Sequence, residues 1–406
     1  LRYAIADTVS TGGKTSAIGN VLRKRDETIY KNPDRLVTFI DNHDIDRIGQ
    51  TLKGNGELIK ACYNLIFTIP GIPQVYYGSE QGFAGQCRAG MFKGSFLDEG
   101  TVQSEDKFDT ENEWYKYFQN LTKMRKENKV FRSNKLFVLQ ETQDNAGIFA
   151  YIVRETDESG KACTESLKGK KAIYVMNTSG NDKILDASYV NIKSGEKYVL
   201  ANYDVHACPL DKTQLTSEFV STADGSKGNV KLVVPGYSSA VYILEEGGIV
   251  ATDGITLEVT SVPSSKITGT EGDSIEIKGK TSKTGTIKMV LNGDYSLSTT
   301  ISATADVEFT QNIDIAAYSN GTIPVQLVQE ENGVPYFSPT KQFTIERPFT
   351  FIESISDPLE DDNGVGAAKG KLSVPTDAEF QKTNDIAGVD VYRSGNDVRL
   401  GVKMSA

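Results

Sequence analysis

The chain is poor in the residues that mark several common protein classes. Its 406 residues include 4 Cys, 2 His and 1 Trp, and 54 Asp and Glu residues outnumber 44 Lys and Arg residues. The net charge of −10 argues against nucleic-acid binding, because a phosphate backbone selects for basic patches. No apolar run reaches the roughly 18 residues that cross a bilayer, so we expect no membrane span.

The four cysteines, Cys62, Cys87, Cys163 and Cys208, show no Cys-x-x-Cys spacing. Neither a zinc site nor a thioredoxin-type motif is therefore indicated. Buried free thiols are one interpretation. A Cys163–Cys208 disulfide is the alternative, because both residues fall in one predicted β-domain, but pairing depends on a distance that the sequence does not fix.

The secondary-structure pattern changes near residue 130. Helix and strand patterns alternate before it, as in a parallel α/β fold. We expect helices over 14–25, 57–67 and 111–127 and strands over 36–40 and 72–77. Alternating runs between turn residues then predict strands over 147–153, 171–177, 198–202, 230–234, 237–244, 255–260, 274–278, 286–291 and 323–328.

One tract carries the most specific chemistry. The apolar run 36–40 leads directly into Asp41-Asn42-His43-Asp44, followed by Arg47 and later by the tract Gly71 to Gln81. A parallel barrel keeps its catalytic groups at the ends of its strands. An isolated Asn-His-Asp tripeptide is usually an ordinary turn, but the strand, Arg47 and the second tract together indicate an active site.

These two tracts resemble the α-amylase family, glycoside hydrolase family 13. The resemblance implies that Asp44 stabilises the oxocarbenium charge of the transition state and that His43 hydrogen-bonds sugar hydroxyl groups. Arg47 and Glu80 are the further substrate-binding candidates, and a structural hydrogen bond is the alternative role of Glu80. Leu121, Arg125 and Asn128 resemble the end of the family's last barrel helix.

Retaining glycoside hydrolysis also needs a nucleophilic carboxylate and a second carboxyl group about 5 Å away. In the family these groups follow barrel strands 4 and 5, and nothing resembling those segments precedes Phe39. Residues 1–7 instead resemble the stretch after strand 6, which makes 36–40 and 72–77 strands 7 and 8. We therefore expect the chain to begin late in the catalytic domain and to be inactive by itself.

The predicted fold class is multidomain, with the C-terminal part of a TIM (β/α)8 barrel followed by all-β sandwich domains. The expected domains are the barrel segment 1–130, a β-sandwich 131–246, an immunoglobulin-like sandwich 249–346 and a truncated β-domain 347–406. The last of these resembles the C-terminal domain of glucodextranases and some amylopullulanases. In the third, Tyr295, Tyr318 and Tyr336 are candidate sugar contacts, and a plain spacer is the alternative that its lack of Trp favours.

Three further features have competing interpretations. The acidic residues Asp357, Asp361 and Asp362 fit either a calcium loop or a solvated turn, of which the turn is slightly favoured. His206 matches no motif and is expected to be an ordinary domain residue. Trp114 lies on an apolar helical face, which indicates core packing rather than a sugar platform.

Two functions fit this sequence. The first is an extracellular or cell-surface hydrolase that cleaves α-1,4-glucosidic bonds in starch-like α-glucans with retention. The second is a non-catalytic glucan-binding or surface-assembly protein, which would bind starch without turnover. The loop 85–92 departs from the family pattern, in which an acidic segment often precedes an Arg, and this difference leaves the exact specificity open.

Overall fold

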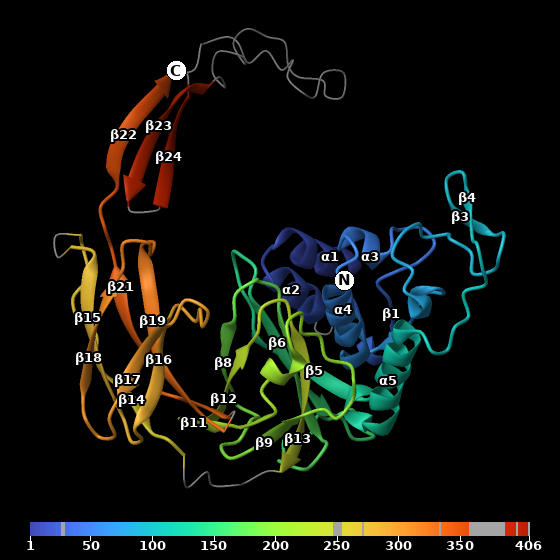
Figure 1. Cartoon of the computed structure of the whole chain (residues 1–406), viewed down its shortest axis with the longest axis horizontal. Coiled ribbons are helices and arrows are strands. Elements are labelled where there is room, and N and C mark those ends of the chain that lie inside the picture. Colours follow the sequence, from blue (N-terminus) through green and yellow to red (C-terminus); the bar gives the residue numbers. More distant parts are fainter. Residues whose placement is uncertain are drawn as a thin grey trace. The chain divides into compact units, whose positions relative to one another are not determined.

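A computed structural model shows the architecture of the chain (Figure 1). The structure describes residues 1–25, 29–246, 254–269, 272–332, 334–356, 386–394 and 397–404. It divides into two compact units, and the first consists of Leu1–Ile255, Thr286–Thr300 and Val328–Phe337. The second consists of Thr256–Gly285, Ile301–Leu327 and Ser338–Ala406. Both family-like tracts therefore fall in the first unit.

The N-terminal segment consists of helices around one short pair of parallel strands. Strand β1 (Val37–Thr38) pairs with β2 (Ile72–Pro73), and Val37 lies opposite Ile72. The helices are α1 (Arg2–Thr11), α2 (Ser16–Lys24), α3 (Ile48–Thr51), α4 (Gly56–Thr68) and α5 (Glu113–Glu127), with short 3₁₀ turns η2 (Pro33–Arg35), η3 (Ser79–Gln81) and η4 (Lys129–Phe131). The three predicted helices are confirmed. Both predicted strands are reduced to two residues, because in the described residues each pairs only with the other.

Helices α4 and α5 begin at side-chain caps that the sequence provides. The Asn55 side chain accepts a hydrogen bond from the Leu58 amide at 3.2 Å, and that of Asn112 accepts one from the Trp114 amide at 2.9 Å. Such caps satisfy amide groups that have no partner inside a helix. Trp114 is half-buried against the helical core, as expected for a packing residue.

Arg125 joins α5 to the end of α4 and the start of β2. Its guanidinium donates hydrogen bonds to the carbonyl oxygen of Phe67, at 2.6 Å, and to that of Gly71. Burial lowers the pKa of Arg125 to about 10, so the side chain is charged at neutral pH. The pattern Leu121, Arg125 and Asn128 thus marks a residue that holds neighbouring elements together.

A β-sandwich follows the helical segment. Its six-stranded antiparallel sheet has the order β10-β9-β13-β7-β6-β5. The strands are β5 (Asn134–Gln140), β6 (Ile148–Glu155), β7 (Lys171–Asn177), β9 (Lys197–Leu200), β10 (Glu218–Val220) and β13 (Ser239–Glu246). A three-stranded sheet contains β8 (Lys183–Tyr189), β11 (Thr222–Asp224) and β12 (Lys227–Val234), and the turn η5 spans Lys212–Gln214. The five strands predicted here are confirmed, whereas β5, β8, β10 and β11 were not predicted.

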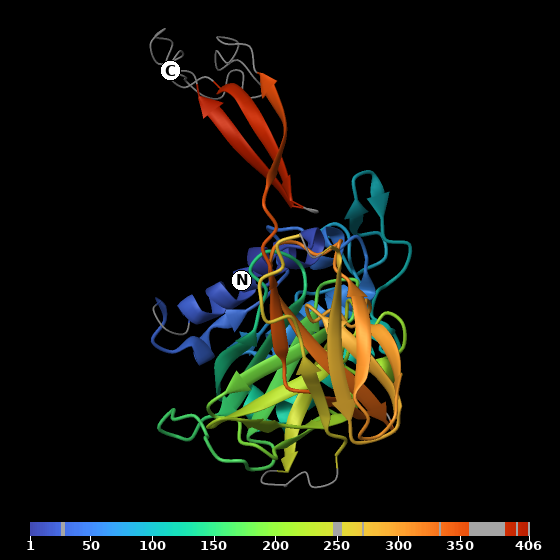
Figure 2. The same ribbon diagram turned by 90° about the vertical axis from the view of Figure 1, so that its left-hand side faces the viewer.

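Strand β6 is buried along its whole length, because both faces of the six-stranded sheet are covered. On one face, Ile152 belongs to the core shared with the three-stranded sheet. On the other, the Tyr151 hydroxyl lies 2.5 Å from that of Thr68, and the Tyr174 hydroxyl donates to the carbonyl of Ala61 at 2.9 Å. These bonds hold α4 against the sheet, and Figure 2 shows the blue helices beside the green strands. Because α4 is held against the sheet, the start of the loop between α4 and β2 is also fixed in position.

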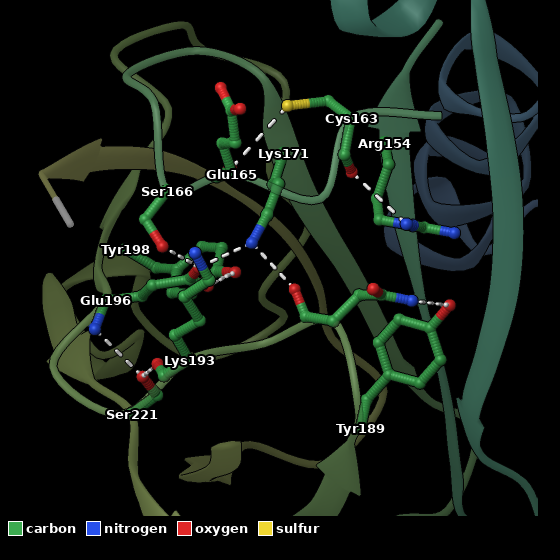
Figure 3. A network of polar contacts seen from close by, with 11 residues as sticks. Arg154, Cys163, Glu165, Ser166, Lys171, Tyr189, Lys193, Glu196, Tyr198 and Ser221 are labelled. Carbon is green, nitrogen blue, oxygen red and sulfur yellow. Dashed lines mark hydrogen bonds and ion pairs between the residues drawn. The ribbon is translucent and has the colours of Figure 1, made fainter. Parts of the chain in front are cut away.

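A buried ion pair lies inside the sandwich (Figure 3). Lys171 Nζ is 2.5 Å from Glu196 Oε1, and both side chains are 0% exposed. Glu196 also accepts hydrogen bonds from the Tyr198 and Ser166 hydroxyls, each at 2.6 Å, and Lys171 donates to the Asn191 carbonyl at 2.6 Å. Burial lowers the pKa of Lys171, and the charge of Glu196 opposes that shift. The pair therefore links β7 to the segment that leads into β9.

All four cysteines are free thiols, so the alternative Cys163–Cys208 disulfide is not formed. The Cys163 thiol donates to the Glu165 carbonyl at 3.6 Å, and the Cys208 thiol to the Asp211 carbonyl at 3.1 Å. Each sulfur is thus engaged within its own loop.

His206 is a buried structural residue, as expected. Its Nε2 lies 2.8 Å from the Ala201 carbonyl oxygen, and its Nδ1 accepts a hydrogen bond from the Val241 amide at 3.4 Å. Burial lowers the pKa of His206 to about 4, so the ring is neutral at neutral pH.

The predicted immunoglobulin-like region is all β. One antiparallel sheet contains β14 (Leu257–Ser261), β15 (Ser274–Thr281) and β18 (Phe309–Asp314). The other contains β16 (Gly285–Leu291), β17 (Thr299–Ala303), β19 (Gly321–Glu331), β20 (Val334–Phe337) and β21 (Lys341–Ile345). Its four predicted strands are confirmed. Tyr295 is buried and its hydroxyl donates to Glu330 at 2.8 Å, so this ring is not exposed as a sugar contact would be.

A last three-stranded antiparallel sheet has the order β22-β23-β24. Its strands are β22 (Thr350–Ser356), β23 (Ile386–Ser394) and β24 (Asp397–Met404). The predicted calcium ligands Asp357, Asp361 and Asp362 lie outside the described residues. Within the described ranges, no helix is both long enough and apolar enough to cross a membrane.

Candidate functional site

The loop after β1 is held in place by Asp41, whose side chain is buried. Its Oδ1 accepts a hydrogen bond from the Ile48 amide at 2.5 Å, and its Oδ2 accepts one from the Tyr63 hydroxyl at 2.7 Å. The first bond satisfies an amide at the start of α3, and the second ties the loop to α4. Burial, together with the charge of Asp41, raises the pKa of Tyr63 well above its usual range. Asp41 is therefore a positioning residue.

Asn42 turns the chain so that the next two side chains reach the surface. Its Oδ1 accepts hydrogen bonds from the amides of Asp44, at 2.9 Å, and Ile45, at 3.0 Å, which is the geometry of an Asx turn. The side chains of His43 and Asp44 are 66% and 62% exposed, and His43 Nε2 lies 3.2 Å from Asp44 Oδ2. The two predicted residues are thus together and accessible.

Arg88 completes this cluster from the loop after β2. Its Nη2 lies 3.4 Å from Asp44 Oδ1, and its Nε donates to the carbonyl of His43 at 3.0 Å. We call these three residues the Asp44 cluster. Arg88 was not among the predicted site residues, although it lies in the loop 85–92, whose departure from the family pattern was a signal.

Arg47 was predicted to contact substrate, but its side chain is fully buried. Its guanidinium donates to the carbonyls of Tyr77, at 2.9 Å, and Cys87, at 3.3 Å, and to the Ser79 hydroxyl at 3.3 Å. In this structure Arg47 therefore holds the loop that carries Arg88, and it does not face a substrate.

Helix α3 and the loop after β2 approach each other closely at Gly49. A Cβ atom on Gly49 would lie 2.5 Å from the Cβ of Ala84, so a larger residue would push the loop away from α3. Glu80, in η3 beside this contact, is half-buried and makes no side-chain hydrogen bond or ion pair with the described residues. Its predicted substrate role stays a prediction.

The geometry limits the chemistry of the Asp44 cluster. An exposed carboxylate beside an imidazole and a guanidinium can stabilise positive charge and bind hydroxyl groups. Among the described residues, the Asp44 side chain pairs with His43 and Arg88, and neither of these carries a carboxyl group. Nor do the described parts of the chain contain three or more His, Cys, Asp or Glu side chains grouped to hold a metal ion.

Comparison with known proteins shows which proteins this region resembles. Residues 14–100 match the family model described as the catalytic domain of α-amylase. This segment is therefore similar to the catalytic domain of α-amylases. It includes β1, β2 and every residue of the Asp44 cluster, so the exposed carboxylate lies within the matched region.

Individual relatives are matched over small parts of their length. An α-amylase of Streptomyces lividans is 30% identical over 173 residues, which are 37% of this chain and 18% of that protein. A cyclomaltodextrin glucanotransferase of Klebsiella oxytoca is 27% identical over 136 residues, covering 29% of this chain and 20% of that protein. The chain therefore spans about a fifth of these α-amylase-family relatives.

Solved structures of the same type are also similar to the chain. A crystal structure of an α-amylase from Geobacillus thermoleovorans, complexed with acarbose, aligns with a TM-score of 0.42 and 20% identity. The alignment covers 61% of this chain and 47% of that one.

Proposed function

We propose that the protein containing this chain hydrolyses α-1,4-glucosidic bonds in starch-like glucans with retention of configuration. The observation that supports this most is the exposed Asp44, beside His43 and Arg88, within the α-amylase-family segment. In this proposal the helical segment is the C-terminal portion of a (β/α)8 barrel, with β1 and β2 as its seventh and eighth strands. The cluster then lies at the carboxyl ends of barrel strands, where such enzymes place their active sites.

Asp44 would act on charge that exists only in the transition state. Glycoside cleavage passes through an oxocarbenium-like state, and a fixed carboxylate nearby stabilises that positive charge. His43 and Arg88 hold the carboxylate from two sides, at 3.2 and 3.4 Å, and their remaining N–H groups are suited to bind sugar hydroxyls. The anchors Asp41 and Arg47 keep both loops in register for this contact.

Retention also requires a nucleophile and an acid/base carboxyl group about 5 Å apart. Neither His43 nor Arg88 can serve as either group. We therefore assign both catalytic carboxyl groups to regions of the protein other than the Asp44 cluster.

The test is Asp44→Asn in the complete native protein, with starch as substrate. We expect kcat to fall about a hundredfold or more while KM changes little, because the lost interaction acts mainly in the transition state. Asp46→Asn is the matched control, since Asp46 is an exposed neighbour outside the cluster. Reducing-end release gives the rates, and NMR of the first product should show the α anomer.

Near-normal turnover by the Asp44→Asn protein would remove Asp44 from the mechanism. Starch binding without any turnover by the native protein would instead favour the non-catalytic glucan-binding function. Calcium binding by Asp357, Asp361 and Asp362 and an extracellular location are further proposals, which a calcium titration and fractionation of the native source would test.

A further inference from the structure

The side chains of the Asp44 cluster do not fix their own positions. They are between 62% and 66% exposed, and the two contacts of Asp44 are 3.2 and 3.4 Å long. Ion pairs in water hold long side chains only weakly, because solvent screens their charges. The distance between Asp44 and Arg88 therefore depends on the backbones of the two loops that carry them, and on what holds those loops from beneath.

Buried polar side chains lie beneath both loops. Each is at most 4% exposed, and the four are Asp41, Arg47, Tyr63 and Ser79. The first two belong to the loop after β1, and Ser79 begins η3 after β2. The loop after β2 then carries Arg88 and leads to the hairpin of β3 (Phe96–Asp98) and β4 (Thr101–Val102). Tyr63 belongs to neither loop, since it lies on α4.

Tyr63 connects the two charged members of this group. Its hydroxyl donates to Asp41 Oδ2 at 2.7 Å, and it also shares a hydrogen bond with the side chain of Ser79. The Ser79 hydroxyl in turn accepts a hydrogen bond from Arg47 Nη1 at 3.3 Å. A buried carboxylate and a buried guanidinium are thus joined through two hydroxyl groups.

The surroundings keep the Tyr63 hydroxyl protonated. Burial raises the pKa of Tyr63 well above its usual range, the charge of Asp41 raises it further, and the charge of Arg47 opposes that shift. A phenol that holds its proton donates to the Asp41 carboxylate at any pH near neutrality. The connection is therefore permanent while the protein is folded.

Each arm of this connection ends next to a member of the Asp44 cluster. Asp41 precedes Asp44 by three residues, and its Oδ1 accepts a hydrogen bond from the Ile48 amide, so the loop is held on both sides of Asp44. On the other arm, Arg47 donates to the carbonyl of Cys87 at 3.3 Å, the residue before Arg88. A change at the Tyr63 hydroxyl therefore acts on both loops.

The protein core places the Tyr63 ring without help from the hydroxyl. The ring meets that of Phe118 on α5 edge to face, with the centroids 4.6 Å apart and the planes at 81°. The Tyr174 hydroxyl holds α4 against the six-stranded sheet through the Ala61 carbonyl. The Tyr63 hydroxyl is thus a fixed point of the core from which both loops are positioned.

We propose that Tyr63 is a positioning residue for the Asp44 cluster, and that its hydroxyl sets the separation of Asp44 and Arg88 by joining the loops that carry them. This inference rests on the proposed function, because it assigns the cluster a task in turnover. Tyr63 itself is 2% exposed and acts only through other residues.

The variant Tyr63→Phe removes the hydroxyl and keeps the ring that packs on Phe118. The matched control is Tyr174→Phe, because Tyr174 is 1% exposed and its hydroxyl also bonds to α4. The other side-chain partner of Tyr174 is Ser239 on β13, so its hydroxyl reaches neither loop. Each variant loses a buried hydrogen bond, and each should unfold at a lower urea concentration than the unchanged chain.

Hydrogen exchange of the full chain, measured by mass spectrometry, tests the connection without any activity. Tyr63→Phe should speed exchange about tenfold in residues 41–48 and 78–90, because the loops lose their common anchor. Tyr174→Phe should leave the exchange of both segments unchanged. Faster exchange in only one segment, or in neither, would overturn the proposal.

Turnover of starch by the complete native protein gives the second test, as a double-mutant cycle. Tyr63→Phe should lower kcat about tenfold or more with little change in KM, since a small misplacement of a group that acts in the transition state has a large effect. When Asp44→Asn is already present, the same change should lower kcat by less than about twofold, because Tyr63 acts through the cluster. Tyr174→Phe should leave kcat unchanged.

The cycle separates positioning from general stability. A loss of kcat that is the same with and without Asp44 would contradict the proposal, as would an unchanged kcat in Tyr63→Phe or an equal loss in Tyr174→Phe. A native protein without turnover would instead disprove the hydrolase function. The exchange experiment would then decide by itself whether Tyr63 joins the two loops.

Discussion

The Lys171–Glu196 pair and the Asp44 cluster are both groups of opposite charges, but they lie in different surroundings. The Lys171 and Glu196 side chains are 0% exposed, and Lys171 Nζ lies 2.5 Å from Glu196 Oε1. Glu196 also accepts hydrogen bonds from the hydroxyls of Tyr198 and Ser166. In the Asp44 cluster the side chains are 62–66% exposed and the contacts are 3.2 and 3.4 Å long.

This difference indicates what each group does. Charges withdrawn from water must be fully paired, and such pairs act on the structure of the protein. Charges that remain in water contribute little to stability, because solvent screens them, so their close grouping needs another reason. In a segment that matches the family model for the α-amylase catalytic domain, the reason that we propose is substrate binding.

The largest effect is expected from breaking the buried pair. Glu196→Gln leaves Lys171 without its counter-charge inside the protein, which should lower the free energy of unfolding by about 3–5 kcal/mol. Urea unfolding measures this loss of stability. The control is Glu245→Gln, because Glu245 forms an exposed ion pair with Lys168. Replacing both partners, as Lys171→Met with Glu196→Leu, should recover much of the loss. A loss below about 1 kcal/mol in Glu196→Gln would contradict the comparison.

The two histidines extend the comparison to pH. The folded-state pKa of His206 is about 4, below the usual 6.5, so the unfolded chain binds more protons between these values. The contribution of neutral His206 to the free energy of unfolding is fully present above about pH 6.5. It is lost as the pH falls to 4, by up to about 3 kcal/mol. Urea unfolding from pH 7 to pH 4 should show a smaller loss in His206→Gln than in His43→Gln. Equal losses would mean that His206 is not the group responsible.

Arg47 tests whether burial makes a site residue structural. Arg47→Lys keeps the charge but loses the guanidinium fork that reaches four partners, so we expect a loss of about 2 kcal/mol in the free energy of unfolding. Cleavage of the loop 82–90 by a protease should become faster in the same variant. If stability is unchanged while KM rises, Arg47 contacts substrate after all.

The smallest effect is expected in the exposed cluster. Asp44→Asn and Arg88→Gln should each change the free energy of unfolding by less than about 0.5 kcal/mol. The same proteins should lose activity in the turnover assay of the complete native protein. A large loss of stability in either variant would show that the cluster supports the fold.

Local sequence patterns were sufficient for most elements. The helices over 57–67 and 111–127 follow from apolar spacing that each helix displays alone, and the caps Asn55 and Asn112 are visible in the sequence. Strands β6 and β7 were found because both sheet faces are buried and their residues are continuously apolar. Strand β5, which pairs only with β6 in its sheet, is partly exposed along its length and was missed.

That Asp44 and His43 follow a strand in an α-amylase-like tract can be read from the chain alone, because motif and strand are local. The burial of Arg47 and the pairing of Arg88 with Asp44 are visible only in the folded protein, since these contacts join loops 30 to 44 residues apart. Whether a side chain is buried depends on what covers it, and local sequence patterns do not contain that information.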